Sequence, residues 1–295
     1  MRDHLEPALV DFLPYHFLLV TGSVRGSLHY LDVSMGKVIS EAKTKRGAPT
    51  CMRQNRQNAV MLMGHSTGEI TMWTPNMGST PVVRILAHPS APLTSLSVSR
   101  DGNYVASTGK DSKLKIWDIR NTYKCLYDYF TPTPAIASDF SDTGLLGVSM
   151  GNMVQIWKNS LKEKQKSPYM KHKAKGIVRA IKFVPFEDVC TLGHDKGYSQ
   201  IVIPGSGEAN FDAFEANPFE SKKQRQEGLV HGLLEKLAPE SISLKIKQVG
   251  QIDDATPEEK EREAREAEER ALEEMNKKEK RRAKKMRGKS KDGHI

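Results

Sequence analysis

A pattern of glycine, a polar turn and alternating apolar residues recurs five times in residues 1–203. The apolar position that closes each copy is occupied in turn by Leu31, Trp73, Trp117, Trp157 and Val202. Successive copies therefore lie 42, 44, 40 and 45 residues apart, and an apolar stretch ending in a Gly or Asp turn precedes each motif. Several short strands repeated at such a period are typical of the blades of a β-propeller. The first two-thirds of the chain are therefore predicted to be all-β.

The repeated copies resemble the WD-repeat family from Leu5 to about Ile203. In the third copy the resemblance implies a hydrogen-bond tetrad inside the blade, formed by His88, Ser107, Asp111 and Trp117. His88 would link the Ser and Asp side chains. Because such residues satisfy one another in a partly buried turn, we expect them to be structural, although the residue types of a catalytic triad are present.

The other copies retain the tetrad less well. The fifth copy repeats its spacing with His172, Thr191 and Asp195, but carries Val202 where the third copy has Trp117. The second and fourth copies have lost the tetrad positions. Their blades are therefore expected to depend on apolar packing alone.

Five copies fall short of the seven blades with which most propellers of this family close. An open propeller would leave the edges of its sheets unpaired. We therefore expect the five blades to be part of a seven-bladed ring, with about two blades missing upstream, or the ring to be closed by other means.

The sequence lacks the motifs of the common enzyme classes. It contains no Walker loop, no dinucleotide fingerprint, no paired-His zinc helix and no nucleophile elbow. The three cysteines are too far apart for a disulfide framework or a metal-ligand pair and indicate a reducing compartment. No apolar run approaches the ~18 residues of a membrane span. We predict a protein without catalytic activity, cofactor or metal.

The periodicity stops after Ile203, and residues 204–250 form a separate C-terminal extension. This extension contains a loop with aromatic residues, a basic turn and an amphipathic helix that ends before Pro239. The helix could pack on the propeller's own surface or bind a partner.

Residues 251–295 form a charged tail, which contributes to a formal net charge of +9 for the chain. Nine Glu oppose four basic residues in the stretch 258–274, whereas residues 277–291 contain ten basic residues and Glu279. Thr256 and Pro257 predict the start of a solvated helix, frayed at its basic end. Such a tail could serve as a solubilising or nuclear-localising extension, or contact the phosphates of a nucleic acid.

The segment that follows the last blade carries a more specific resemblance. Pro-Gly-Ser-Gly-Glu-Ala-Asn-Phe-Asp (204–212), Asn-Pro-Phe (217–219), Lys-Lys-Gln-Arg-Gln-Glu (222–227) and Leu-Leu-Glu-Lys-Leu (233–237) resemble the C-terminal domain of nucleolar WD-repeat proteins of the small-subunit processome. Phe-Leu-Pro-Tyr-His-Phe (12–17) and Pro-Phe-Glu-Asp (185–188) are similar too, so that the resemblance runs from about Phe12 to Leu244.

This resemblance implies a non-catalytic scaffold of the 90S pre-ribosome that supports pre-rRNA processing and 18S rRNA maturation in the nucleolus. The implied partners are other processome proteins, the box C/D snoRNP and pre-rRNA. Basic side chains would neutralise phosphates, while aromatic and aliphatic side chains would anchor neighbouring proteins. The expected contact residues are Phe211, Phe214, Phe219, Lys222, Lys223, Arg225, Leu233, Leu234, Arg281, Arg282, Lys284 and Lys285.

A second hypothesis places the protein in another class. Trp117-Asp118-Ile119-Arg120 resembles the box by which some WD-repeat substrate adaptors dock onto cullin ubiquitin ligases. The box has low specificity, because Trp-Asp also marks the end of an ordinary blade strand.

Overall fold

The computed structural model describes residues 6–89, 91–120, 123–208 and 219–244. These residues belong to one compact unit of the chain, Met1–Val249, whereas the second unit, Gly250–Ile295, lies outside the described residues. The helix and the frayed basic end predicted for the charged tail lie outside them as well.

Within the described residues, nineteen strands form five antiparallel sheets in chain order. The first two sheets contain β1 (Pro7–Leu13), β2 (Leu18–Ser23), β3 (Ser27–Asp32) and β4 (Lys37–Lys43), then β5 (Pro49–Gln54), β6 (Met61–His65), β7 (Glu69–Trp73) and β8 (Val83–Leu86). The third and fourth contain β9 (Leu93–Val98), β10 (Tyr104–Gly109), β11 (Lys113–Asp118) and β12 (Lys124–Phe130), then β13 (Ala137–Phe140), β14 (Leu146–Met150), β15 (Met153–Trp157) and β16 (Met170–Lys173). The fifth contains β17 (Val178–Phe183), β18 (Val189–His194) and β19 (Gly197–Val202).

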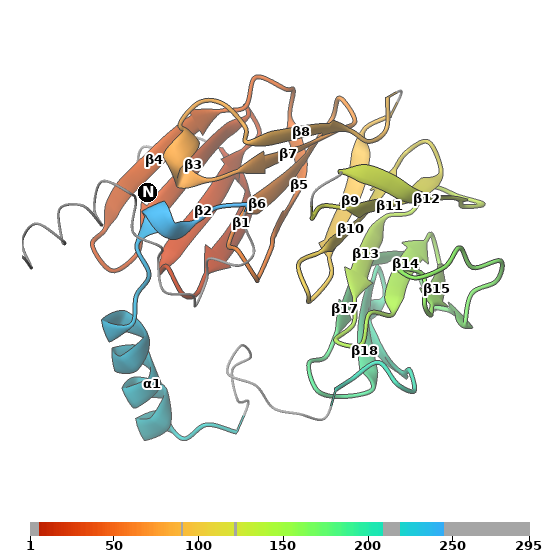
Figure 1. The fold of residues 1–295 in the computed structure, drawn as a ribbon. Coiled ribbons are helices and arrows are strands. Elements are labelled where there is room, and N and C mark those ends of the chain that lie inside the picture. Colours follow the sequence, from red (N-terminus) through yellow and green to blue (C-terminus); the bar gives the residue numbers. More distant parts are fainter. Residues whose placement is uncertain (1–5, 90, 121–122, 209–218, 245–295) are drawn as a thin grey trace, which may run out of the picture. The chain divides into compact units, whose positions relative to one another are not determined.

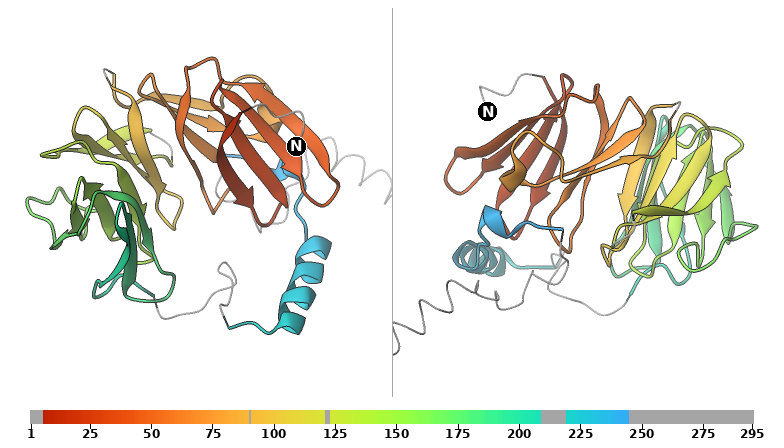
Figure 2. Two further views of the ribbon diagram at one scale, coloured as in Figure 1. Left: turned by 180° about the vertical axis from the view of Figure 1, so that it is seen from behind. Right: turned by 45° about the horizontal axis from the view of Figure 1, so that its top comes forward.

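Each sheet is a simple meander, and the first strand of each sheet contacts the first strand of the next, in the order β1, β5, β9, β13 and β17 (Figures 1 and 2). This is the arrangement of propeller blades. The five residues that define the sequence period lie at or next to the end of the third strand of their sheets. The predicted all-β blade architecture is therefore confirmed.

The buried residues lie between the sheets as well as within them. In β6 all five residues, from Met61 to His65, are buried, because a blade packs against a neighbour on each of its faces. Trp73 and Met61 to Met63 are fully enclosed in the largest apolar cluster. Burial of each such side chain stabilises the fold by about 1.5–3 kcal/mol.

One α-helix follows the blades in the described residues, α1 (Lys222–Leu234). The 3₁₀ turn η1 (Pro75–Met77) lies between β7 and β8, and the 3₁₀ turn η2 (Pro239–Ser241) follows α1. Ser221 caps α1, since its side chain accepts a hydrogen bond from the Gln224 N–H while the Gln224 side chain accepts one from the Ser221 N–H. Residues 222–225 therefore form the first turn of this helix, and the sequence-based assignment of a basic turn there is wrong.

Candidate interaction site on the C-terminal segment

Residues after α1 are anchored on the first blade. The Leu237 N–H donates to the Tyr15 carbonyl oxygen at 2.9 Å, and the Lys236 ammonium donates to Ser34 Oγ at 2.8 Å and to the Asp32 carboxylate. His16 Nε2 lies 3.0 Å from Ser241 Oγ. The loops that follow β1 and β3 thus hold the C-terminal segment by backbone and side-chain contacts together.

The second blade completes this anchor. Asn76 Nδ2, in η1, donates to the Glu240 carbonyl oxygen at 2.8 Å. Ile242 is 2% exposed and joins the main apolar cluster, and Leu244 packs against the same cluster. The segment from Lys236 to Leu244 is therefore part of the packed protein and positions α1 next to the first blade.

The surroundings shift the pKa values of two titratable groups at this anchor, Asp32 and His16. Burial opposes ionisation of Asp32, but hydrogen bonds from Lys236, from Ser34 and from the Met35 N–H together hold the pKa of this carboxyl below its usual value. Burial lowers the pKa of His16 to about 4, so that its imidazole is neutral at physiological pH. At physiological pH the Asp32 carboxyl is therefore ionised and the His16 imidazole is uncharged.

Helix α1 presents an exposed surface that contains both charged and apolar side chains. Leu229 and Val230 are each 56% exposed and Leu234 is 79% exposed, while Leu233 is exposed as well. The helix approaches the blade at Gly232, where a Cβ would lie 3.3 Å from Cζ of Phe17. Because no residue of α1 is buried, its apolar side chains are available to another molecule.

Six of the twelve contact residues predicted from the sequence lie in the described part of the chain, and all six are exposed. Phe219 is 87% exposed, Lys222, Lys223 and Arg225 lie in the exposed first turn of α1, and Leu233 and Leu234 lie in its last turn. An ion pair of 3.7 Å joins Lys223 to Glu227. The remaining predicted contacts lie outside the described residues: Phe211, Phe214, Arg281, Arg282, Lys284 and Lys285.

The third blade contains the hydrogen-bond network that the resemblance implies. His88 Nδ1 lies 2.9 Å from the Asp111 carboxylate, and His88 Nε2 lies 3.1 Å from Ser107 Oγ. Trp117 Nε1 donates to the same Ser107 Oγ at 2.9 Å. His88 and Ser107 are completely buried, so these bonds satisfy polar groups that water does not reach.

The fifth blade lacks such a network among the described residues. No hydrogen bond joins His172, Thr191 and Asp195 there, and the Asp195 carboxylate instead accepts from Arg179 Nε at 2.7 Å. His172 lies on β16 of the preceding sheet, paired with Val154. Without a Trp at Val202, this blade has no indole N–H to join such a set.

The second blade has an unforeseen polar core. His65 Nε2 lies 2.7 Å from Thr71 Oγ1, which also accepts a 2.7 Å hydrogen bond from Trp73 Nε1. The expectation that this blade depends on apolar packing alone is therefore wrong. Its His comes from the second strand, six residues before the Thr, and the spacing of the third copy could not reveal it.

The charged side chains of the Trp-Asp-x-Arg box contact one another and a ring of the same blade. Arg120 Nη2 lies 2.6 Å from Asp118 Oδ2, and the Arg120 guanidinium lies 5.4 Å from the centre of the Tyr104 ring. These contacts explain the Asp and the Arg structurally, as a turn at the end of β11.

In the described part of the chain, no group of three or more His, Cys, Asp or Glu side chains is placed to hold a metal ion. No helix of that part is long and apolar enough to cross a membrane.

Sequence comparisons match the two parts of this architecture. Residues 79–118 match the WD domain (G-beta repeat), and residues 168–245 match the BING4CT (NUC141) domain. The second match includes the last blade, α1 and the anchor described above. The chain belongs to the WD-repeat proteins that carry a BING4CT domain.

Within this class, the chain is similar over most of its length to several curated proteins. It is 44% identical over 270 residues to the U3 small nucleolar RNA-associated protein 7 of Saccharomyces cerevisiae. This match covers 86% of this chain and 48% of the yeast protein. It is 41% identical over 257 residues to human WD repeat-containing protein 46, covering 86% and 42% of the two chains. The chain thus spans about half the length of these relatives.

A solved structure shares the fold. The structure of U3-55K superposes with a TM-score of 0.60 at 14% sequence identity, over 70% of this chain and 64% of that chain. At this identity the likeness supports the propeller fold alone.

Proposed function

We propose that this chain acts as a non-catalytic scaffold in small-subunit ribosome assembly, in the nucleolus. The blades form a rigid support, and the anchored C-terminal segment presents α1 as a surface for neighbouring proteins and RNA. Other processome proteins, the box C/D snoRNP and pre-rRNA are the partners that we assign to it. In this function the protein supports pre-rRNA processing and 18S rRNA maturation by holding its partners together.

The observation that carries this proposal is the contrast between the anchor and α1. Residues 236–244 are fixed on two blades by hydrogen bonds and by burial of Ile242. The helix directly before them exposes four aliphatic side chains in its second half and basic residues in its first turn. A helix that follows directly into an anchored segment and keeps its apolar side chains in solvent is suited to a groove on another protein.

The comparisons support the assignment to ribosome assembly. The yeast relative is named for its association with the U3 small nucleolar RNA, and the matched BING4CT domain includes the anchor residues themselves. The basic first turn of α1 provides charges that an RNA partner would neutralise.

To test the proposal, exposed leucines of α1 are substituted in a tagged protein, and the partners recovered with it from cells are measured. Leu233→Glu with Leu234→Glu should reduce recovery of processome proteins and pre-rRNA and should slow 18S maturation. Val38→Glu with Ile39→Glu on β4 is the matched control, since these residues are 52% and 41% exposed. Undiminished recovery with the α1 variant, or equal losses with both variants, would contradict the proposal.

A further inference from the structure

The connection between β15 and β16 is unusually basic. Residues 158–175 contain seven lysines against a single acidic residue, Glu163, which gives this stretch a net charge of +6. The seven are Lys158, Lys162, Lys164, Lys166, Lys171, Lys173 and Lys175, and all are exposed. The connection itself, residues 158–169, is the longest between a third and a fourth strand in the four-stranded sheets. We call residues 158–175 the lysine edge.

The lysine edge is held in place by aromatic residues of the preceding blade. The Tyr127 hydroxyl donates to the Lys162 carbonyl oxygen at 2.7 Å, and the Gln165 N–H donates to the Tyr129 hydroxyl at 3.0 Å. At its far end, the Tyr169 N–H donates to the Ile156 carbonyl oxygen at 2.8 Å. These bonds fix the backbone of the connection, so its charges are displayed on a supported surface.

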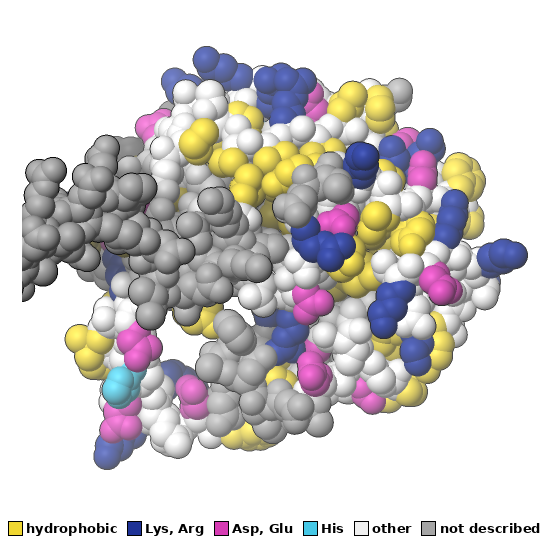
Figure 3. Space-filling view, in the orientation of Figure 1, with side chains coloured by type: hydrophobic (Ala, Val, Ile, Leu, Met, Phe, Trp, Pro, Cys, Tyr) yellow, Lys and Arg dark blue, Asp and Glu magenta, His cyan; other side chains and the backbone are white. Residues whose placement is uncertain are grey.

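The charges of the lysine edge are not neutralised within the described protein. Among the described residues, no ion pair joins any of the seven lysines to an acidic group. Asp128 lies between Tyr127 and Tyr129 on β12, but its carboxylate pairs with Lys113. Figure 3 shows Lys and Arg side chains over the side of the molecule where Figure 1 labels β12 and β15. These ammonium groups can therefore pair with the negative charges of another molecule.

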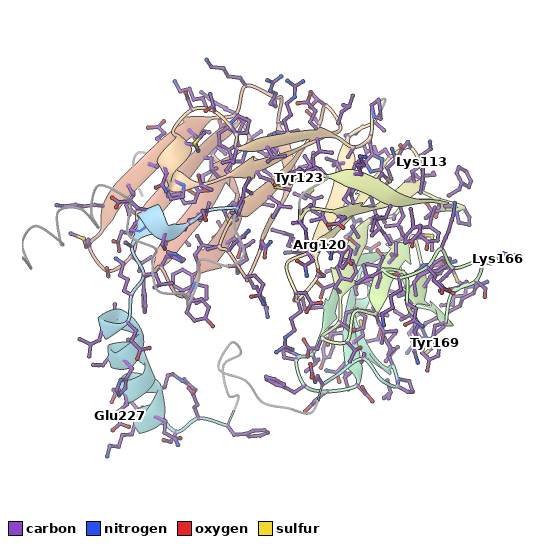
Figure 4. All side chains as sticks on the ribbon, viewed as in Figure 1. Lys113, Arg120, Tyr123, Lys166, Tyr169 and Glu227 are labelled. Carbon is purple, nitrogen blue, oxygen red and sulfur yellow. The ribbon has the colours of Figure 1, made fainter. Side chains whose placement is uncertain are left out.

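Aromatic rings lie among these lysines. Lys158 Nζ is 5.4 Å from the centre of the Tyr169 ring, which is 44% exposed, and Lys164 Nζ is 5.9 Å from the centre of the Tyr129 ring. The Tyr129 ring also lies 5.3 Å from that of Trp157. Figure 4 shows Lys166 and Tyr169 on the same side of the molecule. The Tyr129 ring is buried and supports the connection, whereas the half-exposed Tyr169 ring lies beside a cationic side chain and offers a face on which an unpaired base can stack.

We infer that the lysine edge binds the phosphate backbone of single-stranded RNA. Lys171 and Lys173 lie on the same face of β16, about 6.6 Å apart along the strand, and can contact successive phosphates of an extended strand. A protein partner fits less well, because lysine is depleted at protein–protein interfaces. This inference deepens the proposed function, on which it rests, by assigning RNA contacts to blade 4 as well as to α1.

The chemistry of the lysine edge determines what kind of recognition to expect. Lysine ammonium groups act as point charges and lack the planar fork with which arginine reads base edges or clamps phosphates. Binding should therefore be insensitive to base sequence and strongly dependent on salt. Each lost phosphate contact should reduce the salt dependence of binding to a single strand by about 0.7 in the slope of log K against log salt.

The test measures binding of the whole chain to a fluorescent single-stranded RNA of mixed sequence by anisotropy, over a range of salt concentrations. The variant carries Lys162→Gln, Lys164→Gln, Lys166→Gln and Lys171→Gln. We expect its affinity at low salt to fall more than about tenfold and the slope to decrease in magnitude by about 3. The matched control carries Lys37→Gln, Lys43→Gln, Lys45→Gln and Lys196→Gln, four exposed lysines elsewhere, and should bind as the unchanged chain does.

Photo-cross-linking separates the possible outcomes. Cross-linked nucleotides on the peptide that contains Tyr169, lost in the lysine variant, would support the inference. The inference would be overturned if the lysine variant bound RNA with unchanged affinity and slope, or if the control lost as much affinity. It would also be overturned if the lysine variant bound RNA as before but bound an acidic peptide more weakly than the unchanged chain does. RNA binding that persists through other residues would leave the proposed function standing, whereas a chain that binds no RNA at all would contradict both.

Discussion

Lys236 and Asp32 form an ion pair between residues 204 positions apart in the chain, and it joins the C-terminal segment to the end of β3. The Asp32 side chain is 4% exposed and that of Lys236 is 19% exposed. Because the pair is largely shielded from water, loss of Lys236 leaves the Asp32 carboxylate buried without its opposite charge, with only the hydrogen bonds from Ser34 and the Met35 N–H. This pair makes the position of α1 dependent on the first blade.

The first prediction concerns this ion pair. Lys236→Ala should lower the free energy of unfolding by about 3 kcal/mol, since it leaves the Asp32 carboxylate buried without its partner. It should also make residues 219–244 more susceptible to limited proteolysis. Lys223→Ala is the control: that side chain is 85% exposed, so its ion pair with Glu227 should contribute less than about 0.5 kcal/mol. Similar effects from the two substitutions, measured by denaturant unfolding, would argue against the anchor.

The second prediction concerns the tetrad of the third blade. Ser107→Ala removes the acceptor for Trp117 Nε1 and the partner of His88 Nε2, and both groups are buried. The substitution should destabilise the protein by about 1–3 kcal/mol. Ser167→Ala, at an exposed position, should change the unfolding free energy by less than about 0.5 kcal/mol. A Ser107→Ala protein as stable as the unchanged chain would show that the network is energetically unimportant.

The third prediction concerns acid stability. Burial lowers the pKa of both His16 and His65 to about 4, from an ordinary value of 6.5. Below pH 6.5 the unfolded chain therefore binds protons that the folded protein does not, and stability falls as the pH decreases from about 6.5 towards 4. We expect each histidine to account for about 1–3 kcal/mol of this loss. His16→Gln should make the decline shallower in unfolding experiments across this pH range, and an unchanged decline would refute the assignment.

The fourth prediction concerns the turn between β6 and β7. Gly68 has φ +82°, and a Cβ there would lie 1.8 Å from the His88 carbonyl oxygen. Gly68→Ala should therefore cost more than about 3 kcal/mol or prevent folding, because the backbone of the next blade entry must move. Gly151 has φ +61° with open space around it, so Gly151→Ala should cost only about 1 kcal/mol. Thermal melts of the two variants provide the comparison.

The blades could be predicted from the sequence because each one repeats the same alternation, and five copies reinforce one another. The anchor could not, because the contacts of Lys236 with Asp32 and of Gly232 with Phe17 join distant residues without any period. The start of α1 was readable in principle, since Ser221 and Gln224 have capping-box spacing. The network of His65, Thr71 and Trp73 was missed because its histidine lies at the end of the second strand, whereas His88 of the third copy lies in the connection between β8 and β9.

The lysine edge was visible in the sequence as a charge run but is informative only in the folded protein. The sequence does not show that Tyr127 and Tyr129, more than thirty residues earlier, hold this stretch in place. Nor does it show that the seven lysines lack acidic partners among the described residues. Its significance therefore depends on contacts between two neighbouring blades.

The scaffold assignment is tested most directly by RNA cross-linking in living cells with the tagged natural protein. We predict that pre-rRNA and small nucleolar RNA are recovered well above the background of an untagged strain, and that the protein is concentrated in the nucleolus. Recovery at background level, with the protein dispersed through the cytoplasm, would contradict a role in small-subunit ribosome assembly.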